Sequence, residues 1–546
     1  MEELKTAGRQ LRAAIDRYRN VCFSIHNLSH GGIRNILENH LDDIKAELLH
    51  FPSYEPKLRE SWLAINKTHN SLAQLTPINS LPSEILTQIF HTVLASEPCP
   101  LDLQASADIS SEISRNSSHT LSLGDDFPRC PDYLAHVCTH WRQLALSSPK
   151  LWVHIDFIPH EKFHKGLLAR AEVHAARANI LPLIVHLYEG QRTDYNADQI
   201  TSFLASISHR MKALDFTIIK YCGRFTATVF DALLSECNSE SSVFTQFVMT
   251  LIGNQHGARL RPNDDGSEYK LRDLILNLPR SAVEQALCHI SVLQLRGIFL
   301  DWSSTVYGGL VDLRLVSSSN RNWDSIPESN LRTILESSPR LRVLHFALEI
   351  THISPKGTPV TPVRLDDLEM VNVSTLDDEE GETGLGTILR LLAPGSQPVQ
   401  LSVWHQRHPY RGGDLAVDEL AKFLQRSDVT RFSAKGGCPP LHEFLCYAPN
   451  LEDLILDSCI PIYGSVELSK NDSPQVKPLR SLIVHNYSPS IDLLEALLVQ
   501  YPSKLLMVSD HPGFEGAGHV EEVLTEKHPD TKILIYKGQP PGEFAS

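Results

Sequence analysis

The residues with the clearest potential for chemistry are His160–His164, whose sequence HEKFH matches the pattern HExxH. On a helix this spacing places two imidazoles on one face, where they can bind zinc while Glu161 acts as general base. The chain contains 26 histidines, and no HxxGxxH extension follows because Gly166 comes too early. Glu189 is the available third ligand, but it lies in the turn sequence EGQRTD. We therefore expect an exposed connecting helix and no metal, with zinc hydrolysis as the alternative.

The other candidate motifs for catalysis are weaker. The glycine-rich stretch Gly381–Gly386 follows the acidic run Asp377–Glu380. A phosphate-binding turn requires positive potential, so we predict a loop there. Neither GxSxG nor GxxxxGK[ST] occurs, and Cys222, Cys237 and Cys288 lie in apolar contexts that favour burial over nucleophilic chemistry. We therefore predict a protein that is not an enzyme and uses no cofactor.

Composition indicates a folded protein of the cytoplasm or nucleus. The chain has 546 residues, of which 42% are hydrophobic and 21% charged, which suits two or three domains. The net charge of -15 disfavours nucleic-acid binding. Ten cysteines without a CxxC pair suggest reduced thiols. The first twenty residues lack the apolar core of a signal peptide, and no apolar run is long enough for a membrane span.

Residues 1–76 are predicted to form a helical arm. Apolar residues recur there at helical spacing, in three stripes separated by glycines and prolines. We expect a helical hairpin packed on the rest of the chain, and a dimerising coiled coil is the alternative. The stripes are Leu4, Leu11, Ile15 and Tyr18; Ile33, Ile36, Leu37, Leu41, Ile44 and Leu48; and Leu58, Trp62, Ile65, Leu72 and Leu75.

Residues 77–156 are predicted to contain two apolar helices separated by a Ser-, Asp- and Pro-rich insertion at about 97–130. Pro82 suits the first turn of the first helix, while Asp132 and Pro149 suit the N-cap and the end of the second. So small a unit buries too little surface to be stable alone, so its apolar faces require a cover. The faces carry Leu81, Ile85, Leu86, Ile89, Phe90, Val93 and Leu94, and then Tyr133, Leu134, Val137, Cys138, Trp141, Leu144 and Ala145.

The two blocks of this segment, LPSEILTQIF and LAHVCTHWRQLALSSPKLW, resemble the F-box motif. In that motif LPxEIL opens the first helix and VCxxWRxLAxxPxLW closes the unit. The whole chain is similar in plan to the F-box-like proteins of mushroom-forming fungi, which often place helices before the motif and a leucine-rich region after it. The insertion is a departure, because an uninterrupted F-box has a short turn there.

The resemblance implies a substrate-recognition adaptor of a Skp1–cullin–F-box ubiquitin ligase. The F-box would bind a Skp1-type adaptor, and through it a cullin, while the following region captures a target protein. The alternative is a leucine-rich interaction scaffold that joins no ligase and covers the apolar face of residues 81–94 itself. Exposure of Ile85 and Ile89 would distinguish the two. The implied Skp1 contacts are Leu81, Pro82, Ile85, Leu86, Ile89, Val137, Trp141, Leu144 and Trp152.

Residues 157–546 are predicted to form an irregular leucine-rich repeat solenoid of strands and helices. A helix within 157–180 leads to a strand at Leu183–Leu187, after which the frame LxxLxL recurs with helical stretches between its copies. A doubly wound α/β domain is the alternative, but no Gly-rich phosphate turn follows any strand. The expected fold is therefore α/β, with an all-α arm and F-box-like helices before the solenoid. The frames are MKALDF at 211, LRDLIL at 271, ISVLQL at 290, LVDLRL at 310, LRVLHF at 341, LDDLEM at 365, LEDLIL at 451 and LRSLIV at 479, with degenerate copies near 399, 429, 504 and 531.

Three tryptophans lie just after predicted strands, at Trp302, Trp323 and Trp404. On a repeat scaffold such side chains are candidate hot spots for a bound protein, and packing in the core or rim is the alternative. The usual Asn or Cys after the strand is present in one copy, as Cys459, so a regular asparagine ladder is not expected.

Overall fold

The computed structural model describes nineteen stretches of the chain. They form two compact units, Met1–Ile89 with Tyr133–Ala145, and Phe90–Asp132 with Leu146–Ser546. All three boundaries between the units, at 89/90, 132/133 and 145/146, fall inside the segment 77–156. The described residues are 1–30, 40–71, 77–96, 131–157, 166–189, 197–219, 224–236, 243–253, 257–262, 273–318, 323–355, 360–376, 384–406, 417–437, 441, 445–460, 477–485, 489–509 and 517–536.

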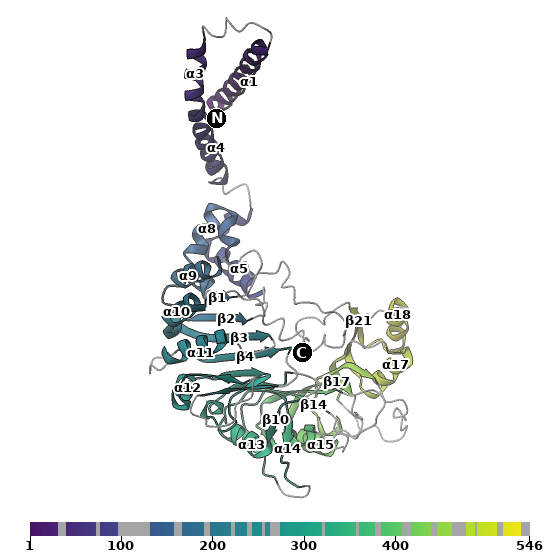
Figure 1. Cartoon of the computed structure of the whole chain (residues 1–546). Helices are drawn as coiled ribbons and strands as arrows, with labels where there is room; N and C mark the ends of the chain where they lie inside the picture. The colour runs from purple at the N-terminus through teal and green to yellow at the C-terminus, as the bar shows by residue number, and fades with distance from the viewer. Residues whose placement is uncertain are drawn as a thin grey trace. The chain divides into compact units, whose positions relative to one another are not determined.

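The arm is helical, as its apolar stripes predict. Three helical segments of the arm follow one another directly, and α1 lies beside them (Figure 1). The ring of Tyr18 in α1 packs against Phe51 and Tyr54, with centroids 6.4 and 6.2 Å apart, and the Tyr54 hydroxyl donates to Glu47 at 3.0 Å. These contacts make the arm a hairpin. Its elements are α1 (Glu2–His30), α3 (Leu41–His50), η1 (Phe51–Ser53) and α4 (Tyr54–Ser71).

The arm has no buried core of its own among the residues that the structure describes. No described side chain between Met1 and Thr68 is buried, and Trp62 is 64% and Leu49 81% exposed. The expectation that this hairpin packs on the rest of the chain stays a prediction. Helical spacing sets the face on which apolar residues gather, but it does not supply a cover for that face.

The F-box-like segment forms the predicted first helix but not a single second helix. Cys138 interrupts it with an extended backbone, φ −157° and ψ 172°. The Cys138 sulfur accepts a hydrogen bond from the backbone N–H of Trp141 at 3.5 Å, so this residue caps the following helix. Asp132 is not the expected cap, since Tyr133 holds the N-cap position without a side-chain bond. The elements are η3 (Pro77–Ser80), α5 (Ser83–Ser96), α7 (Leu134–Val137), α8 (Thr139–Leu146) and η4 (Pro149–Trp152).

The second unit is built on a fourteen-stranded, all-parallel sheet whose strands neighbour one another in the order in which they occur along the chain. The frames and their degenerate copies fall on these strands except β1, β2 and β4, and β2 is the strand expected at Leu183–Leu187. In β1 and β4, phenylalanine, isoleucine and methionine replace leucine. The frame at 365 ends at Met370, where β14 begins, and the frame at 271 falls on a short strand outside this sheet. The strands are β1 (His154–Phe157), β2 (Leu183–Glu189), β3 (Met211–Ile219), β4 (Gln246–Ile252), β7 (Val292–Arg296), β9 (Asp312–Val316), β11 (Val343–Ala347), β14 (Met370–Leu376), β16 (Pro398–Gln406), β17 (Asp428–Gly437), β18 (Asp453–Ile460), β19 (Leu479–His485), β20 (Ser503–Ser509) and β21 (Lys532–Tyr536).

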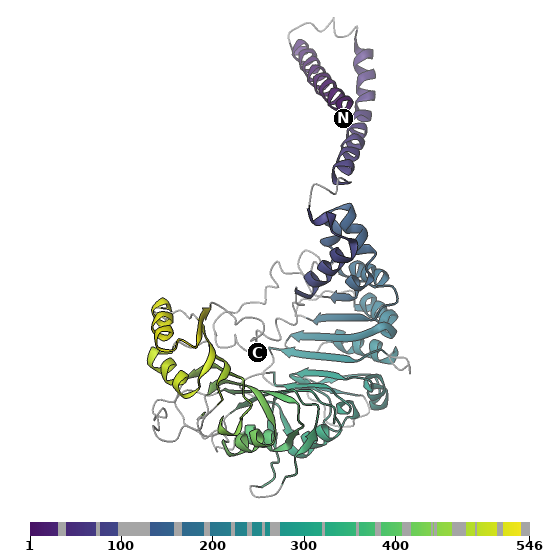
Figure 2. The ribbon, with the colours of Figure 1, turned by 180° about the vertical axis from the view of Figure 1, so that it is seen from behind.

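Helices connect most of these strands, and α9 to α12 lie together along one side of β1 to β4 (Figures 1 and 2). Gly384–Gly386 belongs to a helix, which corrects the expected loop for the described part of that glycine-rich stretch. The helices are α9 (Leu167–Arg177), α10 (Ala197–Ile207), α11 (Arg224–Glu236), α12 (Arg280–Leu287), α13 (Glu328–Glu336), α14 (Gly384–Leu391), α15 (Val417–Gln425), α17 (Ile491–Gln500) and α18 (Ala517–Lys527), with η6 (Ser208–Arg210), η7 (Thr305–Tyr307) and η8 (Leu445–Tyr447).

The leucine frames place two apolar rows across one face of the sheet, because alternate residues of a strand share a face. Helix α11 packs on this face: Phe230 lies 5.4 Å from Phe216 and 5.8 Å from Phe247, between ring centroids. The strand register aligns Leu293, Leu313 and Leu344 in the first row. The first row in full is Ile155, Val185, Leu214, Phe247, Leu293, Leu313, Leu344, Val371, Leu401, Phe432, Leu454, Leu482, Leu506 and Ile533, and every member is buried.

Short parallel strands, which come between the main strands along the chain, form three further small sheets. Gly297 makes the turn from β7 into one of these strands with φ +67°, where a Cβ atom would lie 2.4 Å from the Cβ of Ser318. A glycine is therefore required at this position. The short strands are β5 (Ala258–Arg261) with β6 (Leu274–Ile275) and β8 (Ile298–Phe299), β10 (Ser325–Pro327) with β12 (Glu349–Thr351), and β13 (Val363–Leu365) with β15 (Leu392–Pro394).

Candidate functional site

The two F-box-like blocks meet through a hydrogen bond. The indole N–H of Trp141 in α8 donates to Asn79 Oδ1 in η3 at 2.8 Å, although the residues are 62 positions apart. Helix α5 begins beside η3, where the Leu86 N–H donates to the Pro82 carbonyl at 3.1 Å. The proline lacks an N–H that would need a partner there. This geometry holds the start of α5 and the start of α8 in one structure.

Most of the predicted contact residues remain accessible on these helices. Ile85 is 49% and Val137 57% exposed, and Pro82 is also exposed. The half-buried side chains are Leu81, Ile89, Trp141 and Leu144. A large apolar side chain that is half exposed loses water-accessible apolar area only when something covers it, so Ile85 and Val137 are suited to contact a partner.

Leu86 and Trp152 differ from these residues because both are fully buried. The Trp152 ring meets His174 edge-on at 5.0 Å, and the Arg177 guanidinium lies 4.2 Å from its centroid. Trp152 therefore packs inside the second unit. In this conformation neither Leu86 nor Trp152 presents its side chain to another molecule.

A buried polar cluster at the first edge of the sheet was not anticipated from the sequence. Arg170 donates to Asp132 at 2.7 Å and to Asp156 at 3.4 Å, and His174 lies 3.4 Å from Asp132. Burial by itself raises the pKa of Asp132, but hydrogen bonds from His174 and Arg170 outweigh it and lower that pKa to about 2. His174 also bonds the backbone carbonyl of His154 in β1 at 3.0 Å. Because each member has a partner, we assign the cluster to holding α9 against the edge strand.

Several of the other candidate motifs fall on residues whose placement the structure does not describe. HEKFH at His160–His164, Cys222, Cys237 and the insertion 97–130 lie outside the described residues. Cys288 is exposed, not buried as expected. Among residues with a described placement, no group of His, Cys, Asp or Glu is arranged to hold a metal ion. The ammonium of Lys435 lies 5.2 Å from the Trp404 ring, and Trp302 lines a pocket described below.

Within the described stretches, no helix has both the length and the apolar composition that a membrane crossing requires. Comparisons with known proteins return neither a family whose model matches the chain nor a curated protein that matches it.

Proposed function

We propose that this chain is a substrate-recognition adaptor, which binds a Skp1-type protein through the F-box-like helices and a target protein through the second unit. The observation that carries this proposal is the exposure of Ile85 in α5 and Val137 in α7, one from each block. The Trp141–Asn79 bond between α8 and η3 links the same two blocks. The ligase would position the target for ubiquitin transfer by proximity, without catalysis by this chain.

The sheet supports the second half of the proposal. Parallel strands in chain order, with helices between them and leucine rows on one face, are what stacked strand–helix repeats produce. We propose an irregular leucine-rich repeat solenoid on this basis. Its opposite sheet face carries polar side chains such as Arg314 and Asp312, whose charged groups are 3.0 Å apart, which suits recognition of a protein.

Co-purification of the full-length chain with Skp1 tests the adaptor role. We expect wild type to retain Skp1, and Ile85→Asp and Val137→Asp to weaken binding at least tenfold, because each places a charge in an apolar interface. The matched control is Ile180→Asp in the second unit, where the side chain is 84% exposed and binding should be unchanged. The double variant Leu81→Ala/Pro82→Ala should also lose Skp1.

If wild type does not retain Skp1, or both aspartate variants retain it as wild type does, the adaptor role is rejected. The alternative is then an interaction scaffold outside any ligase. Complete burial of Leu86 favours that alternative to a limited extent, because part of the α5 face is already covered within the chain.

A further inference from the structure

The second unit contains a pocket that the adaptor role does not use. It encloses about 240 Å³ and is lined by residues of β5, of the first turn of α12 and of the segment after β8. The turn at Gly297 and the short strand pairing place the end of β8 beside β5, where Ala258 pairs with Ile298 and Arg259 with Phe299. Three segments that are distant in sequence therefore build one concave site.

Arg259 is the group in this pocket with spare binding capacity. Its guanidinium lies 4.5 Å from the centroid of Trp302 and 5.7 Å from that of Phe299. One N–H donates to the Leu300 carbonyl at 3.2 Å, and no carboxylate among the described residues lies within ion-pair distance. Burial lowers the pKa of Arg259, which shows that its charge is poorly solvated. These two ring contacts hold the guanidinium by cation–π attraction and leave further N–H donors for a ligand.

The other two arginines of the pocket already have anionic partners. Arg261 pairs with buried Asp273 at 2.9 Å, and Arg280 pairs with Glu284 at 2.9 Å. Their charges are thereby compensated. Arg259 is attracted by Asp324 and Asp301, but among the described residues neither carboxylate forms an ion pair with it.

Two carboxylates line the pocket and limit the charge of a ligand. Burial raises the pKa of Asp301, but hydrogen bonds from Ser303 outweigh it, so its net pKa is lowered. Glu284 also has a lowered pKa, because bonds from Arg280 and Thr305 outweigh the effect of burial. Both groups are therefore ionised at neutral pH. They would repel a doubly charged phosphate more strongly than a singly charged carboxylate.

The remaining walls are apolar. Leu260, Val283 and Leu300 are buried, and the indole of Trp302 adds an aromatic face. Pockets of this kind take a ligand whose apolar body fills the volume while one polar group fixes its orientation. We propose that the pocket binds a carboxylate carried on a compact apolar or aromatic group, with Arg259 donating to both carboxylate oxygens. The source is either a small organic acid or the C-terminal residue of a protein.

Titration of the purified full-length chain with phenylacetate tests this binding by ligand-observed NMR. Phenylacetamide is the matched neutral probe, since it has the same shape without the charge. We expect phenylacetate to bind at least tenfold more tightly than phenylacetamide and than phenyl phosphate at neutral pH. Equal binding of phenylacetate and phenylacetamide would overturn the proposal, and so would tighter binding of phenyl phosphate.

Substitution then assigns the binding to Arg259. Arg259→Gln should weaken acid binding at least tenfold, and Arg259→Lys should fall between it and wild type, because lysine keeps the charge but loses the planar fork. Arg332→Gln is the control, since Arg332 pairs with Glu336 on α13 and does not line the pocket. Unchanged affinity in both Arg259 variants would overturn the assignment, and the acid–amide comparison in wild type remains decisive if a variant fails to fold.

The peptide N-acetyl-Gly-Gly-Phe, as free acid and as amide, distinguishes the two sources. Preference for the peptide acid over phenylacetate identifies a protein C-terminus as the ligand, and the reverse preference identifies a small acid. Failure of both acids to bind rejects the proposal. The purified chain is tested without Skp1, so this result is separate from that of the adaptor experiment.

Discussion

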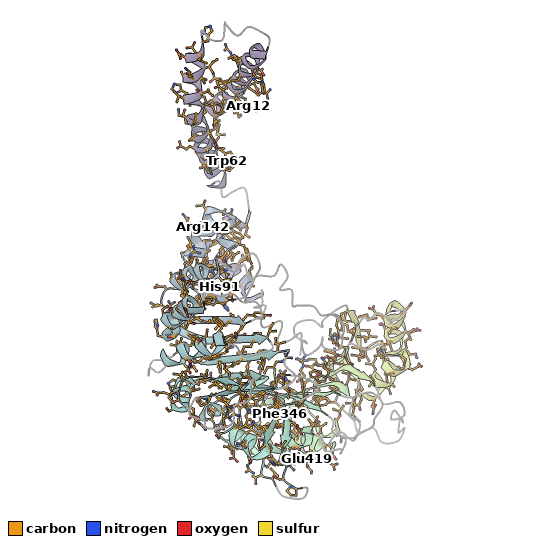
Figure 3. All side chains as sticks on the ribbon, in the orientation of Figure 1. Arg12, Trp62, His91, Arg142, Phe346 and Glu419 are labelled. Carbon is orange, nitrogen blue, oxygen red and sulfur yellow. The ribbon has the colours of Figure 1, made fainter. Side chains whose placement is uncertain are left out.

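The arm and the sheet differ in how far their regularly spaced apolar residues are buried. Both carry apolar residues at regular spacing, with period 3.6 in the arm and period 2 in the strands. In the sheet these residues form fully buried rows, whereas no described arm side chain up to Thr68 is buried. Figure 3 labels one residue of each kind, Phe346 in the sheet and Trp62 in the arm.

The difference shows that periodicity and burial are separate properties. Each strand adds its leucines to those of the next strand, so a long row is covered by neighbours that the chain itself provides. The arm has only its own hairpin, in which Tyr18, Phe51 and Tyr54 make the ring contacts. Large apolar side chains of the arm such as Trp62 and Leu49 stay exposed.

The largest expected effect is the difference between Phe346→Ala and Trp62→Ala in the free energy of unfolding. Phe346 is 1% exposed, so its truncation should lower the free energy of unfolding by about 3–5 kcal/mol through lost burial and a residual cavity. Trp62 is 64% exposed, and its truncation should change that free energy by less than about 0.5 kcal/mol. Urea unfolding followed by circular dichroism measures both. Similar losses for the two variants would mean that the arm is covered in solution.

Removing a buried ion pair should likewise lower the free energy of unfolding more than removing an exposed one. Arg390 lies 2.7 Å from Glu328, which is 4% exposed, so Arg390→Met leaves a buried carboxylate unpaired and should cost about 3 kcal/mol. Lys5 pairs with Glu2 at 2.9 Å, with both side chains more than half exposed. Lys5→Met should cost less than about 0.5 kcal/mol. Equal unfolding midpoints for the two variants would contradict this ranking.

Acidification should weaken the sheet through His345. Burial, and then the charges of Arg314 and Arg296, lower the pKa of His345 to about 4. The unfolded chain therefore takes up this proton first, and stability falls as the pH drops from about 6.5 towards 4. Between pH 7 and pH 5 we expect wild type to lose roughly 1–2 kcal/mol more than His345→Gln. Parallel urea titrations at the two pH values measure this, and equal losses would exclude His345 as the cause.

The smallest effect concerns the sulfur cap of α8. Cys138→Ala removes the acceptor for the Trp141 N–H and should destabilise the helix by about 0.5–1 kcal/mol. Cys138→Ser restores an acceptor and should recover most of the loss. Amide hydrogen exchange at the start of α8 reports the change, and faster exchange in the serine variant than in the alanine variant would refute the capping role.

Local residue patterns predicted most strands and helices. They did not predict strands β1 and β4 or the interruption of the helix at Cys138. LxL frames located β7, β9 and β11 because alternation and leucine content act within a few residues. Strands β1 and β4 carry Ile155, Phe157, Phe247 and Met249 in the same rows, so a search for leucine passed over them. The interruption at Cys138 was missed because helical spacing continues across it.

The candidate contact residues were partly predictable. The residue pattern located α5 and α8, but their exposure separates Ile85 and Val137 from the buried Leu86 and Trp152. Burial depends on what packs against each side chain, and for Trp152 the neighbours are His174 and Arg177. Spacing along one helix contains no information about such neighbours.

The sequence by itself therefore determined most of the helices and strands and the apolar face of each, because those properties depend on residues within a turn or two. Tertiary structure alone decided which apolar faces are covered, which carboxylates pair with Arg170, and why Arg259 forms no ion pair within the described part of the chain. Each of these depends on segments far apart in the chain, such as β5, α12 and the residues after β8, that come together only on folding. Short-range periodicity cannot encode those distances.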